Sequence, residues 1–234
     1  MLPALAASSL GQAFEPVLLR EFEEDVYQVN NHYSAVVTLA EAGGQIFFFG
    51  DDGWLNEPLD SIERRPALWK TDGTQAGTVR VKENIMRRGA SASEEEYDTH
   101  TVRSQIKEFL SLGNRVIFTV QRYTLDEYGQ TEEGRCELWS SDGTEAGTLI
   151  IAYPEYVAWA PKDFTPSGPI VYFSAWDGLH GRELWRTDGT EMGTYMMADI
   201  RPGEEGSDPQ ELVDANGTLF FSADDGTHGR ELWK

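Results

Sequence analysis

The sequence contains a single cysteine, Cys136, among its 234 residues. One cysteine cannot form an intrachain disulfide, and it cannot supply the several thiolates of a structural zinc site. The chain therefore has to fold around its own apolar core, which a chain of this length can bury. Cysteine usage does not indicate a cellular compartment.

Basic residues are also scarce, with 19 Lys and Arg against 40 Asp and Glu and a formal net charge of -21. A charge of this sign repels phosphate backbones, so nucleic acid is excluded as the expected partner. An acidic surface suits extracellular solubility, a basic partner or loose cation binding. Most commonly it is simply a solvated face.

Long apolar runs and the common catalytic motifs are missing as well. No stretch approaches the roughly 20 apolar residues of a membrane helix, so no membrane span is expected. The sequence has no HExxH zinc motif, nucleophile elbow, phosphate-binding loop or dinucleotide fingerprint. An active site assembled from several repeats, such as a carboxylate pair, stays open.

The first 13 residues are apolar and rich in small side chains, with no charge before Phe14. They resemble the second half of a secretory signal but have no basic region in front. We expect residues 1–13 to be a signal-like or disordered leader. A single domain should follow over residues 14–234.

The feature that organises the sequence is a repeat, most complete at 183–194 as Glu-Leu-Trp-Arg-Thr-Asp-Gly-Thr-Glu-Met-Gly-Thr. It recurs at 137–148 and 68–78, and a shortened copy occupies 231–234. An apolar run, an Asp-Gly-Thr turn and a second β-rich run predict a strand, a tight turn and a returning strand. The chain is therefore expected to be an array of hairpins.

These copies resemble the ELWxxDGT repeats of bacterial surface and secreted proteins. The resemblance covers most of the chain from the fourth decade of residues onward. It implies a β-rich repeat fold and a secreted or cell-surface location. Because that family is described by its repeat rather than by an activity, it implies no catalytic residue.

The spacing of the repeat indicates the architecture. Trp139 and Trp185 are 46 residues apart, and Trp185 and Trp233 are 48 apart, close to the roughly 40 to 45 residues of four-stranded propeller units. Each repeat offers a weak strand, an aromatic strand, the Leu-Trp strand and a strand after Gly-Thr. We expect an all-β propeller of four-stranded antiparallel blades. The repeats should lie at approximately 35–84, 105–154, 163–200 and 209–234. The first strand of the first repeat should lie at 35–39.

Two versions of this propeller stay open. Residues 16–23 match the fourth strand of the third repeat in apolar pattern but have no blade in front of them. If they pair with residues 231–233, about four blades close into a ring, which would remove exposed sheet edges. Alternatively, the chain is a fragment of a larger propeller.

Three aspartates precede Gly-Thr in the repeat: Asp72, Asp142 and Asp188. They could form a ring of carboxylates for Ca²⁺, or each could cap its own turn while the glycine supplies a positive φ. Asp-Gly-Thr offers too few oxygens for a six- to eight-coordinate ion. The turn interpretation is favoured, and no cofactor is expected. His180 and His228, at equivalent repeat positions, are likewise interpreted as structural.

Four tryptophans hold the repeat position: Trp69, Trp139, Trp185 and Trp233. Stacking on sugars is possible for them, but their fixed place in apolar strands favours packing between blades. Three others, Trp54, Trp159 and Trp176, fall outside the repeat and are candidates for exposed contacts.

A glutamate precedes Leu-Trp in three repeats, at Glu137, Glu183 and Glu231. Each has an arginine nearby, namely Arg135, Arg182 and Arg230, and we interpret these as local ion pairs. The first repeat has Ala67 instead, so that pair should be missing.

Insertions give the clearest functional indication. The first two repeats carry nine extra residues between the aromatic strand and the tryptophan, within 51–66 and 121–135, and the linker 82–105 is also long. By strand parity, all three should emerge at one end of the array, opposite the Asp-Gly-Thr turns. They contain the aromatic and arginine residues that interface hot spots favour, from which we select Trp54, Arg64, Arg65, Tyr97, Tyr123 and Tyr128 as candidate binding residues.

The sequence thus supports two functional hypotheses. The first is a non-enzymatic, secreted or cell-surface module that binds a protein or a glycan through the insertion-bearing face, or packs on further repeats of the same chain. The alternative is a propeller hydrolase or lyase with a carboxylate site at the channel mouth. Two carboxylates, or a carboxylate and a histidine, converging in one pocket with perturbed pKa values would favour the alternative.

Overall fold

The computed structural model of the chain describes residues 38–50, 67–83, 85, 103–125, 131–152 and 159–234. Within these ranges all regular structure is β, in four antiparallel sheets with no helix among them. The expected all-β class is confirmed for this part of the chain. The predicted leader 1–13, the predicted closing strand 16–23 and the insertion 51–66 lie outside it.

Each sheet takes its strands from one continuous stretch of sequence, and strands adjacent in the sequence are adjacent in the sheet. Sheet 1 contains β1 (Leu39–Ala42), β2 (Gln45–Gly50), β3 (Ala67–Thr71) and β4 (Val79–Lys82). Sheet 2 contains β5 (Arg103–Leu112), β6 (Arg115–Leu125), β7 (Thr131–Ser141) and β8 (Leu149–Ala152). Sheet 3 contains β9 (Lys162–Ser167), β10 (Ile170–Trp176), β11 (Arg182–Thr187) and β12 (Tyr195–Ala198), and sheet 4 contains β13 (Gln210–Ala215), β14 (Thr218–Asp224) and β15 (Arg230–Trp233).

The predicted four-stranded repeat is confirmed in sheets 1 to 3. One boundary differs, because the first strand was expected at 35–39 and β1 instead runs from Leu39 to Ala42. A turn at Gly43 and Gly44, both at positive φ, pairs Ala42 with Gln45 and so places β1 directly before it. Among the described residues no helix is long and apolar enough to cross a membrane.

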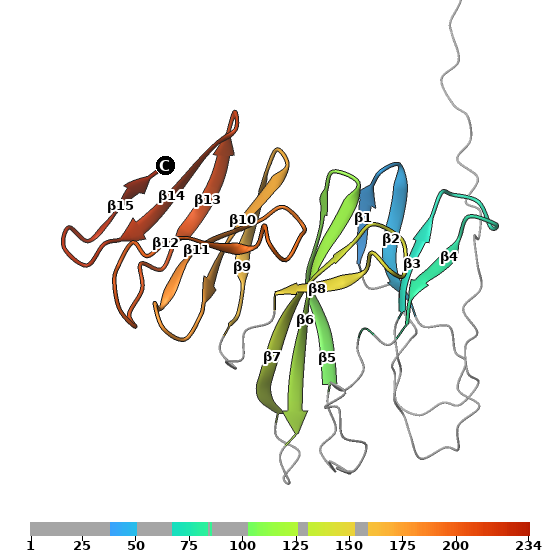
Figure 1. Cartoon of the computed structure of the whole chain (residues 1–234), viewed down its shortest axis with the longest axis horizontal. Coiled ribbons are helices and arrows are strands. Elements are labelled where there is room, and N and C mark those ends of the chain that lie inside the picture. Colours follow the sequence, from blue (N-terminus) through green and yellow to red (C-terminus); the bar gives the residue numbers. More distant parts are fainter. Residues whose placement is uncertain (1–37, 51–66, 84, 86–102, 126–130, 153–158) are drawn as a thin grey trace, which may run out of the picture.

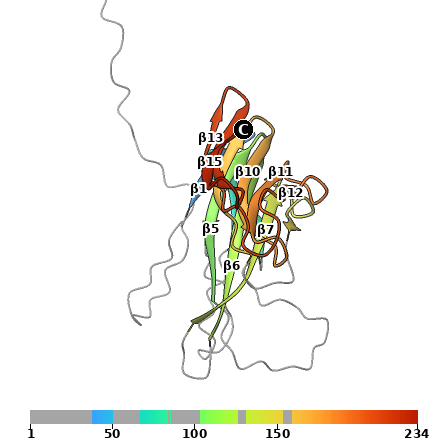
Figure 2. The same cartoon turned by 90° about the vertical axis from the view of Figure 1, so that its left-hand side faces the viewer.

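The sheets stand side by side in sequence order along the long axis of the molecule (Figure 1). Contacts run from β1 to β5, from β5 to β9 and from β9 to β13. The first strand of each sheet therefore lies next to the first strand of the following sheet. Viewed from the end of the array, the sheets line up behind one another (Figure 2).

Every sheet has two distinct faces. On one, an aromatic residue of the second strand lies opposite the repeat tryptophan of the third, as Phe118 lies opposite Trp139 and Phe173 opposite Trp185. We call this the Phe–Trp face. The leucine before each tryptophan points to the other side, because successive strand residues alternate. We call that side the Leu face.

The core is divided among the gaps between successive sheets, where the Leu face of one sheet packs on the Phe–Trp face of the next. The gap between sheets 1 and 2 contains Phe47, Phe49, Leu68, Phe118 and Trp139. The gap between sheets 2 and 3 contains Ile117, Leu138, Val171, Phe173 and, half-buried, Trp185. The gap between sheets 3 and 4 contains Leu184, Leu212, Leu219, Phe221 and, half-buried, Trp233.

Trp139 packs between sheets, as predicted, and is 8% exposed. Trp69 is 2% exposed but clusters with Phe48 and Ala67 of its own sheet and belongs to none of the three gaps. Trp185 is only half-buried, and the indole of Trp159 stands edge-on against it with ring centroids 6.2 Å apart. Trp159 is itself 1% exposed, so its predicted role in exposed contacts is wrong. Trp176, at the end of β10, is half-buried.

The Asp-Gly-Thr turns close on their own side chains. In the first, Oδ1 of Asp72 accepts hydrogen bonds from the backbone N–H and the hydroxyl of Thr74, at 2.9 and 2.7 Å. The Thr74 hydroxyl oxygen in turn accepts from the N–H of Gly77 at 2.9 Å. The same bonds surround Asp142 and Asp188. The predicted role of these carboxylates as turn caps is confirmed.

The second glycine of the motif is required by the same network. A Cβ on Gly77 would lie 2.0 Å from Oδ1 of Asp72, and a Cβ on Gly147 would lie 2.1 Å from Oδ1 of Asp142. No side chain fits there while the aspartate caps the turn. The spacing from Asp to Gly in the repeat is thus fixed by contact between these two residues.

Replacing Asp142 with alanine should lower the unfolding free energy at pH 7 by about 1 kcal/mol, because two hydrogen bonds to the carboxylate are lost. The bonds from the Thr144 hydroxyl and N–H lower the pKa of Asp142 below 3.8. Their contribution is therefore full above pH 3.8 and fades as the pH falls through the lower folded pKa. Urea unfolding should give a smaller difference in unfolding free energy between the parent and Asp142→Ala in acid than near neutral pH. Glu145→Ala, an exposed change in the same turn, should leave the unfolding free energy unchanged at both pH values.

Candidate functional site

The second insertion, residues 121–135, forms paired strands where a loop was expected. Residues 121–135 were expected to form a loop, but β6 and β7 continue their pairing from Val116↔Ser141 out to Leu125↔Thr131, interrupted only by a register shift at Arg122. β5 pairs along the same extension as far as Arg103↔Tyr123. Residues added to both strands of a hairpin can continue the ladder, which satisfies their backbone groups better than a loop does.

We call this extension, residues 103–106, 120–125 and 131–136, the finger. It projects beyond sheets 1 and 3 at the end of the array opposite the Asp-Gly-Thr turns (Figure 1). Of the candidate binding residues, Tyr123 lies in the finger, opposite Glu133 in β7. The other five, Trp54, Arg64, Arg65, Tyr97 and Tyr128, lie outside the described residues.

A largely buried ion pair closes the base of the finger. Arg122 of β6 donates through Nε and Nη2 to the two carboxylate oxygens of Glu137 in β7, at 2.8 and 2.7 Å. Their side chains are 12% and 11% exposed. Glu137 also accepts a bond from the indole N–H of Trp139 at 2.9 Å, which connects the finger to the core. Arg122, fifteen residues before Glu137, was not considered as its partner in the sequence analysis.

Glu183, at the equivalent position of sheet 3, is fully buried and holds the linker to sheet 4. Its Oε1 accepts from the backbone N–H groups of Ser207 and Arg201, at 2.9 and 3.2 Å. Its Oε2 accepts from the Ser207 hydroxyl at 2.5 Å. The predicted ion pair with Arg182 is wrong, because neighbouring strand residues point to opposite faces.

Arg182 and Arg230 instead bind backbone carbonyls. Arg182 Nη1 donates to the carbonyls of Ala160 and Ser174 at 2.8 and 3.1 Å, and burial lowers its pKa. Arg230 Nη1 donates to the carbonyl of Asp208 at 2.9 Å, while Nη2 pairs with the Asp208 carboxylate at 3.1 Å. Each arginine thus ties the second and third strands of its sheet to the segment leading into the first strand.

In the first repeat, Ala67 replaces the glutamate. There the indole N–H of Trp69 donates to the carbonyl of Gly50 at 3.2 Å. In the last repeat, the indole N–H of Trp233 donates in the same way to the carbonyl of Ala223 at 3.1 Å. The tryptophan therefore does not need the glutamate for its hydrogen bond.

The loop before β11 lies against the linker that Glu183 holds. A Cβ on Gly181 would lie 2.2 Å from the backbone nitrogen of Gly206, and a Cβ on Gly206 would lie 2.2 Å from that of Arg182. The N–H of Asp208 donates to the carbonyl of Arg182 at 2.9 Å. The two segments therefore approach backbone to backbone.

Gly181→Ala should be clearly more destabilising than Gly229→Ala, its counterpart in sheet 4. Both glycines have positive φ, at 69° and 80°, so both variants share the cost of a left-handed conformation, about 1 to 3 kcal/mol. Only Gly181 has backbone within reach of a new Cβ, whereas Gly229 has nothing within 4 Å. Overpacking should add about 1 to 3 kcal/mol. Equal thermal midpoints for the two variants would contradict the close approach.

Three carboxylates occupy one position of the first strand in successive sheets: Glu108, Asp163 and Glu211. Each lies ten residues before the aromatic residue of its Phe–Trp face, at an irregularity in the register of its strand pair. Asp163 and Glu211 have positive φ, at 62° and 54°. Since β5, β9 and β13 are neighbours, these carboxylates form a row along the inner strands.

The row contains a perturbed group. Burial raises the pKa of Glu108, and the charge of Asp163 raises it further. Lys162 offsets part of the negative charge, with its Nζ 3.8 Å from Oδ2 of Asp163 and 3.9 Å from Oδ1 of Asp208. None of the three carboxylates was among the predicted site residues, although the constant spacing of ten residues from each aromatic residue is visible in the sequence.

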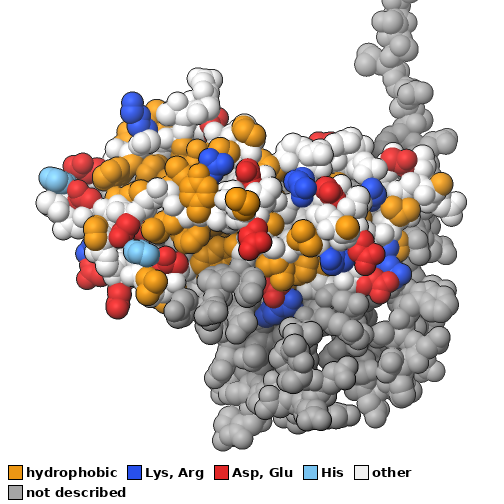
Figure 3. Space-filling view, in the orientation of Figure 1, with side chains coloured by type: hydrophobic (Ala, Val, Ile, Leu, Met, Phe, Trp, Pro, Cys, Tyr) orange, Lys and Arg blue, Asp and Glu red, His pale blue; other side chains and the backbone are white. Residues whose placement is uncertain are grey.

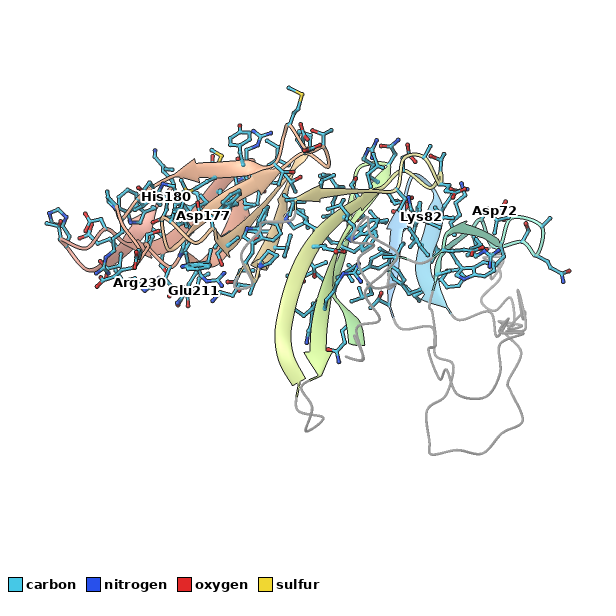
Figure 4. The ribbon with its side chains drawn as sticks, turned by 60° about the horizontal axis from the view of Figure 1, so that its bottom comes forward. Asp72, Lys82, Asp177, His180, Glu211 and Arg230 are labelled. Carbon is cyan, nitrogen blue, oxygen red and sulfur yellow. The ribbon has the colours of Figure 1, made fainter. Side chains whose placement is uncertain are left out.

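Two carboxylate–histidine pairs lie in the loops between second and third strands. Asp177 Oδ2 and His180 Nδ1 are 2.7 Å apart, and Asp225 Oδ2 and His228 Nδ1 are 2.8 Å apart. The hydrogen bond to aspartate raises the pKa of each histidine. Asp177 and His180 lie side by side in one loop, away from Glu211 and Arg230 (Figure 4). Each aspartate also caps its turn by accepting the histidine N–H at 2.8 Å, so both histidines take part in the structure of their turns.

Within the described residues, no group of three or more His, Cys, Asp or Glu side chains is arranged to hold a metal ion.

Comparisons with known proteins give likenesses of strand arrangement only. No protein-family model matches the chain, and no curated protein matches it. The apo AtxE2 isopeptidase is 14% identical, with a TM-score of 0.41, over 79% of this chain and 24% of its own. The designed Ika4 protein is 17% identical, with a TM-score of 0.37, over 90% of this chain and 98% of its own.

A putative hydrolase from Bacteroides ovatus is 10% identical, with a TM-score of 0.37, over 85% of this chain and 65% of its own. The chain thus spans about a quarter of the isopeptidase and about two thirds of the hydrolase. At these identities and TM-scores, the likenesses carry no conclusion about activity.

Proposed function

We propose that the four sheets are blades of a β-propeller built from ELWxxDGT-type repeats. Three observations support this. Sheets 1 to 3 are four-stranded meanders in sequence order and sheet 4 is a three-stranded one, the first strands of successive sheets are neighbours, and the Leu faces of sheets 1 to 3 each pack on the Phe–Trp face of the next sheet. Propellers combine these features by placing first strands around a common axis.

We further propose that the chain is a non-enzymatic binding module of a secreted or cell-surface protein, and that it binds a protein ligand with the end that carries the finger. The observation that carries this proposal is the finger itself. Its paired strands project beyond the neighbouring sheets, and the Arg122–Glu137 pair anchors it to the core. Binding residues on paired strands are held more precisely than residues on loops.

A protein ligand is favoured over a glycan by the residue types at this end. The three insertions combine tyrosine and tryptophan with several arginines, the composition of protein interface hot spots. The strongly acidic charge of the whole chain would also accelerate the encounter with a basic protein.

The finger can be shortened without touching its base. Replacing residues 124–132 with Asn-Gly, a strong two-residue hairpin turn, retains Arg122 and Glu137. The shortened variant should unfold within a few degrees of the parent and lose capture of its ligand from native extract. Protease treatment of the extract should abolish capture by the parent, whereas deglycosylation should not.

The matched control is Met192→Ser, at an Asp-Gly-Thr turn, where the side chain is 94% exposed at the other end of the array. It should capture the ligand like the parent. Capture that survives shortening of the finger, or that is lost with Met192→Ser, would contradict the assignment of the binding end. Capture that survives protease but not deglycosylation would indicate a glycan ligand.

One observation favours a hydrolase or lyase as the second candidate. Burial and the charge of Asp163 raise the pKa of Glu108, and a carboxyl group with a raised pKa is suited to general acid catalysis. If this row is catalytic, Glu108→Gln and Asp163→Asn should each abolish turnover in a screen of chromogenic glycosides and esters. Activity that is unchanged in both variants, or no activity in the parent, would leave binding as the function.

A further inference from the structure

The outer edge of β7 is unpaired along the finger. β8, the next strand on that side, pairs with β7 only from Leu138 to Ser140. On its other side, β7 pairs with β6 as far as Leu125↔Thr131. Among the described strands, none pairs with residues 131–137 on the side away from β6. We call this stretch of backbone the finger edge.

The finger edge differs from the other outer edges of the array. The outer strands β4, β8 and β12 are each four residues long, and shortness is one way in which proteins protect an edge from pairing. The finger edge is longer and contains no proline. At about 3.3 Å per residue, it offers backbone N–H and C=O groups over roughly 20 Å. It also projects beyond the neighbouring sheets (Figure 1), which leaves room for a further strand.

In sheet 3, the chain itself adds backbone at the equivalent place. At the start of β11, before its pairing with β12 begins, Arg182 forms an isolated parallel bridge with Gly206. The N–H of Asp208 donates to the carbonyl of Arg182 at 2.9 Å. Arg182 and Cys136 hold the same repeat position, directly before Glu-Leu-Trp. The edge of a third strand therefore accepts a further segment of backbone at the position that Cys136 holds in β7.

The charge of the chain indicates which segment suits the finger edge. Glu132 and Glu133 lie within this edge, and Arg135 offsets part of their charge. Acidic side chains are spread along the described length of the array (Figure 3). A strand with basic side chains would be attracted to this edge. A second copy of the chain would be repelled, because each copy has a net charge of -21.

We propose that the finger edge binds an extended segment of the protein ligand, rich in lysine or arginine, as a strand added beside β7. The proposal rests on the binding function proposed for the finger and names the part of the ligand that is recognised. Main-chain hydrogen bonds supply affinity in this mode of binding, and complementary charge selects basic segments. The Arg122–Glu137 pair holds β6 and β7 together at the base of the finger edge, so the edge is preorganised and the entropy cost of binding is lower.

A pair of synthetic peptides tests whether binding uses the backbone. The probe is Lys-Val-Lys-Thr-Lys-Val-Lys, amidated and labelled with a fluorophore at its amino terminus, and fluorescence anisotropy should show saturable binding to the parent chain. The control peptide is N-methylated at every interior residue, so it retains charge and side chains but loses its backbone donors. It should bind at least about tenfold more weakly, because added strands are held by main-chain hydrogen bonds. Equal binding of the two peptides, or no binding of the probe, would overturn the proposal.

Hydrogen exchange of backbone amides, followed by NMR, locates the bound peptide. The probe should slow exchange at alternate residues within 131–137, because alternate amides of an edge strand point away from its partner. The amides of β12, another outer strand, should be unchanged. Slow exchange at the finger edge in the free chain would overturn the proposal, whether at all concentrations, which means that the chain's own residues cover the edge, or only at high concentration, which means self-association.

Two double variants test the role of charge. Glu132→Lys with Glu133→Lys should weaken binding of the probe at least about tenfold, because attractive charges become repulsive. Glu145→Lys with Glu191→Lys makes the same change in net charge at exposed positions of two Asp-Gly-Thr turns, and it should bind the probe like the parent. Equal weakening by both double variants, or no weakening by either, would overturn the charge selection.

The amides of β6 should exchange as slowly in the finger variant as in the parent, which shows that the finger remains formed. If they do not, the two peptides and the parent chain decide the question without any variant.

Failure of this inference differs from failure of the proposed function. Ligand capture that is lost when the finger is shortened, together with equal binding of the two peptides, would retain the finger as the binding end and overturn strand addition. Ligand capture that survives shortening of the finger would overturn the proposed function itself, whatever the peptides show.

Discussion

Glu183→Ala should destabilise the protein by about 3 to 5 kcal/mol, the range found when one member of a buried charged network is removed. The carboxylate is fully buried and accepts bonds from two backbone N–H groups and one hydroxyl. Alanine would leave the donors of Ser207 and Arg201 buried without partners and would release the linker between sheets 3 and 4. Urea unfolding monitored by tryptophan fluorescence measures the loss.

Glu231→Ala is the matched control, because Glu231 holds the same repeat position in sheet 4 but is exposed. It should change stability by no more than about 0.5 kcal/mol. Glu183→Gln retains the shape but turns one acceptor into a donor facing other donors, so it should recover only part of the loss. Equal effects of the alanine changes at 183 and 231 would show that the network contributes nothing.

Leu138→Ala should cost about 2 to 5 kcal/mol, as expected for a leucine truncated in a packed core. Leu138 is fully buried in the gap between sheets 2 and 3, against residues such as Val171 and Phe173. Leu232→Ala, the same change at the same position of sheet 4, should be nearly silent because that side chain is 77% exposed. Chemical denaturation of the two variants provides the comparison. A large effect at both positions would mean that the face of sheet 4 is covered.

The regular part of this fold follows from the sequence. Asp72 and its counterparts cap turns through short-range bonds between residues two to three positions apart, which a motif records directly. Trp139, Trp185 and Trp233 face gaps between sheets because strand alternation assigns a face to every position. Both features depend on local geometry that every copy of the repeat shares.

The irregular part could not be derived in this way. Glu183 binds Ser207, 24 residues later, and nothing in the motif indicates that the linker folds back to it. The ion pair predicted for Glu183 and Arg182 ignored the alternation of strand faces, so that error was avoidable. Trp159 lies outside the repeat, yet it fills space that only the assembled sheets 2 and 3 create.

The candidate sites show the same division. The sequence did not predict that residues 121–135 extend a hairpin. These residues lack clear apolar alternation, and their pairing depends on β5 as well. The row of Glu108, Asp163 and Glu211 could have been found from its constant spacing. The raised pKa of Glu108 could be identified only from the structure, because it depends on burial and on Asp163 of the neighbouring sheet.

Because the core is divided among the gaps, the array behaves as a one-dimensional series of units, each stabilised by its nearest neighbours. Sheet 2 is packed on both faces, whereas sheet 4 is packed on one. Opening of sheet 4 breaks one such contact, and opening of sheet 2 breaks two. Backbone amides of β14 should therefore exchange with deuterium through local unfolding sooner than those of β6. The array would then fray from sheet 4 inward under mild denaturant instead of unfolding as a single unit.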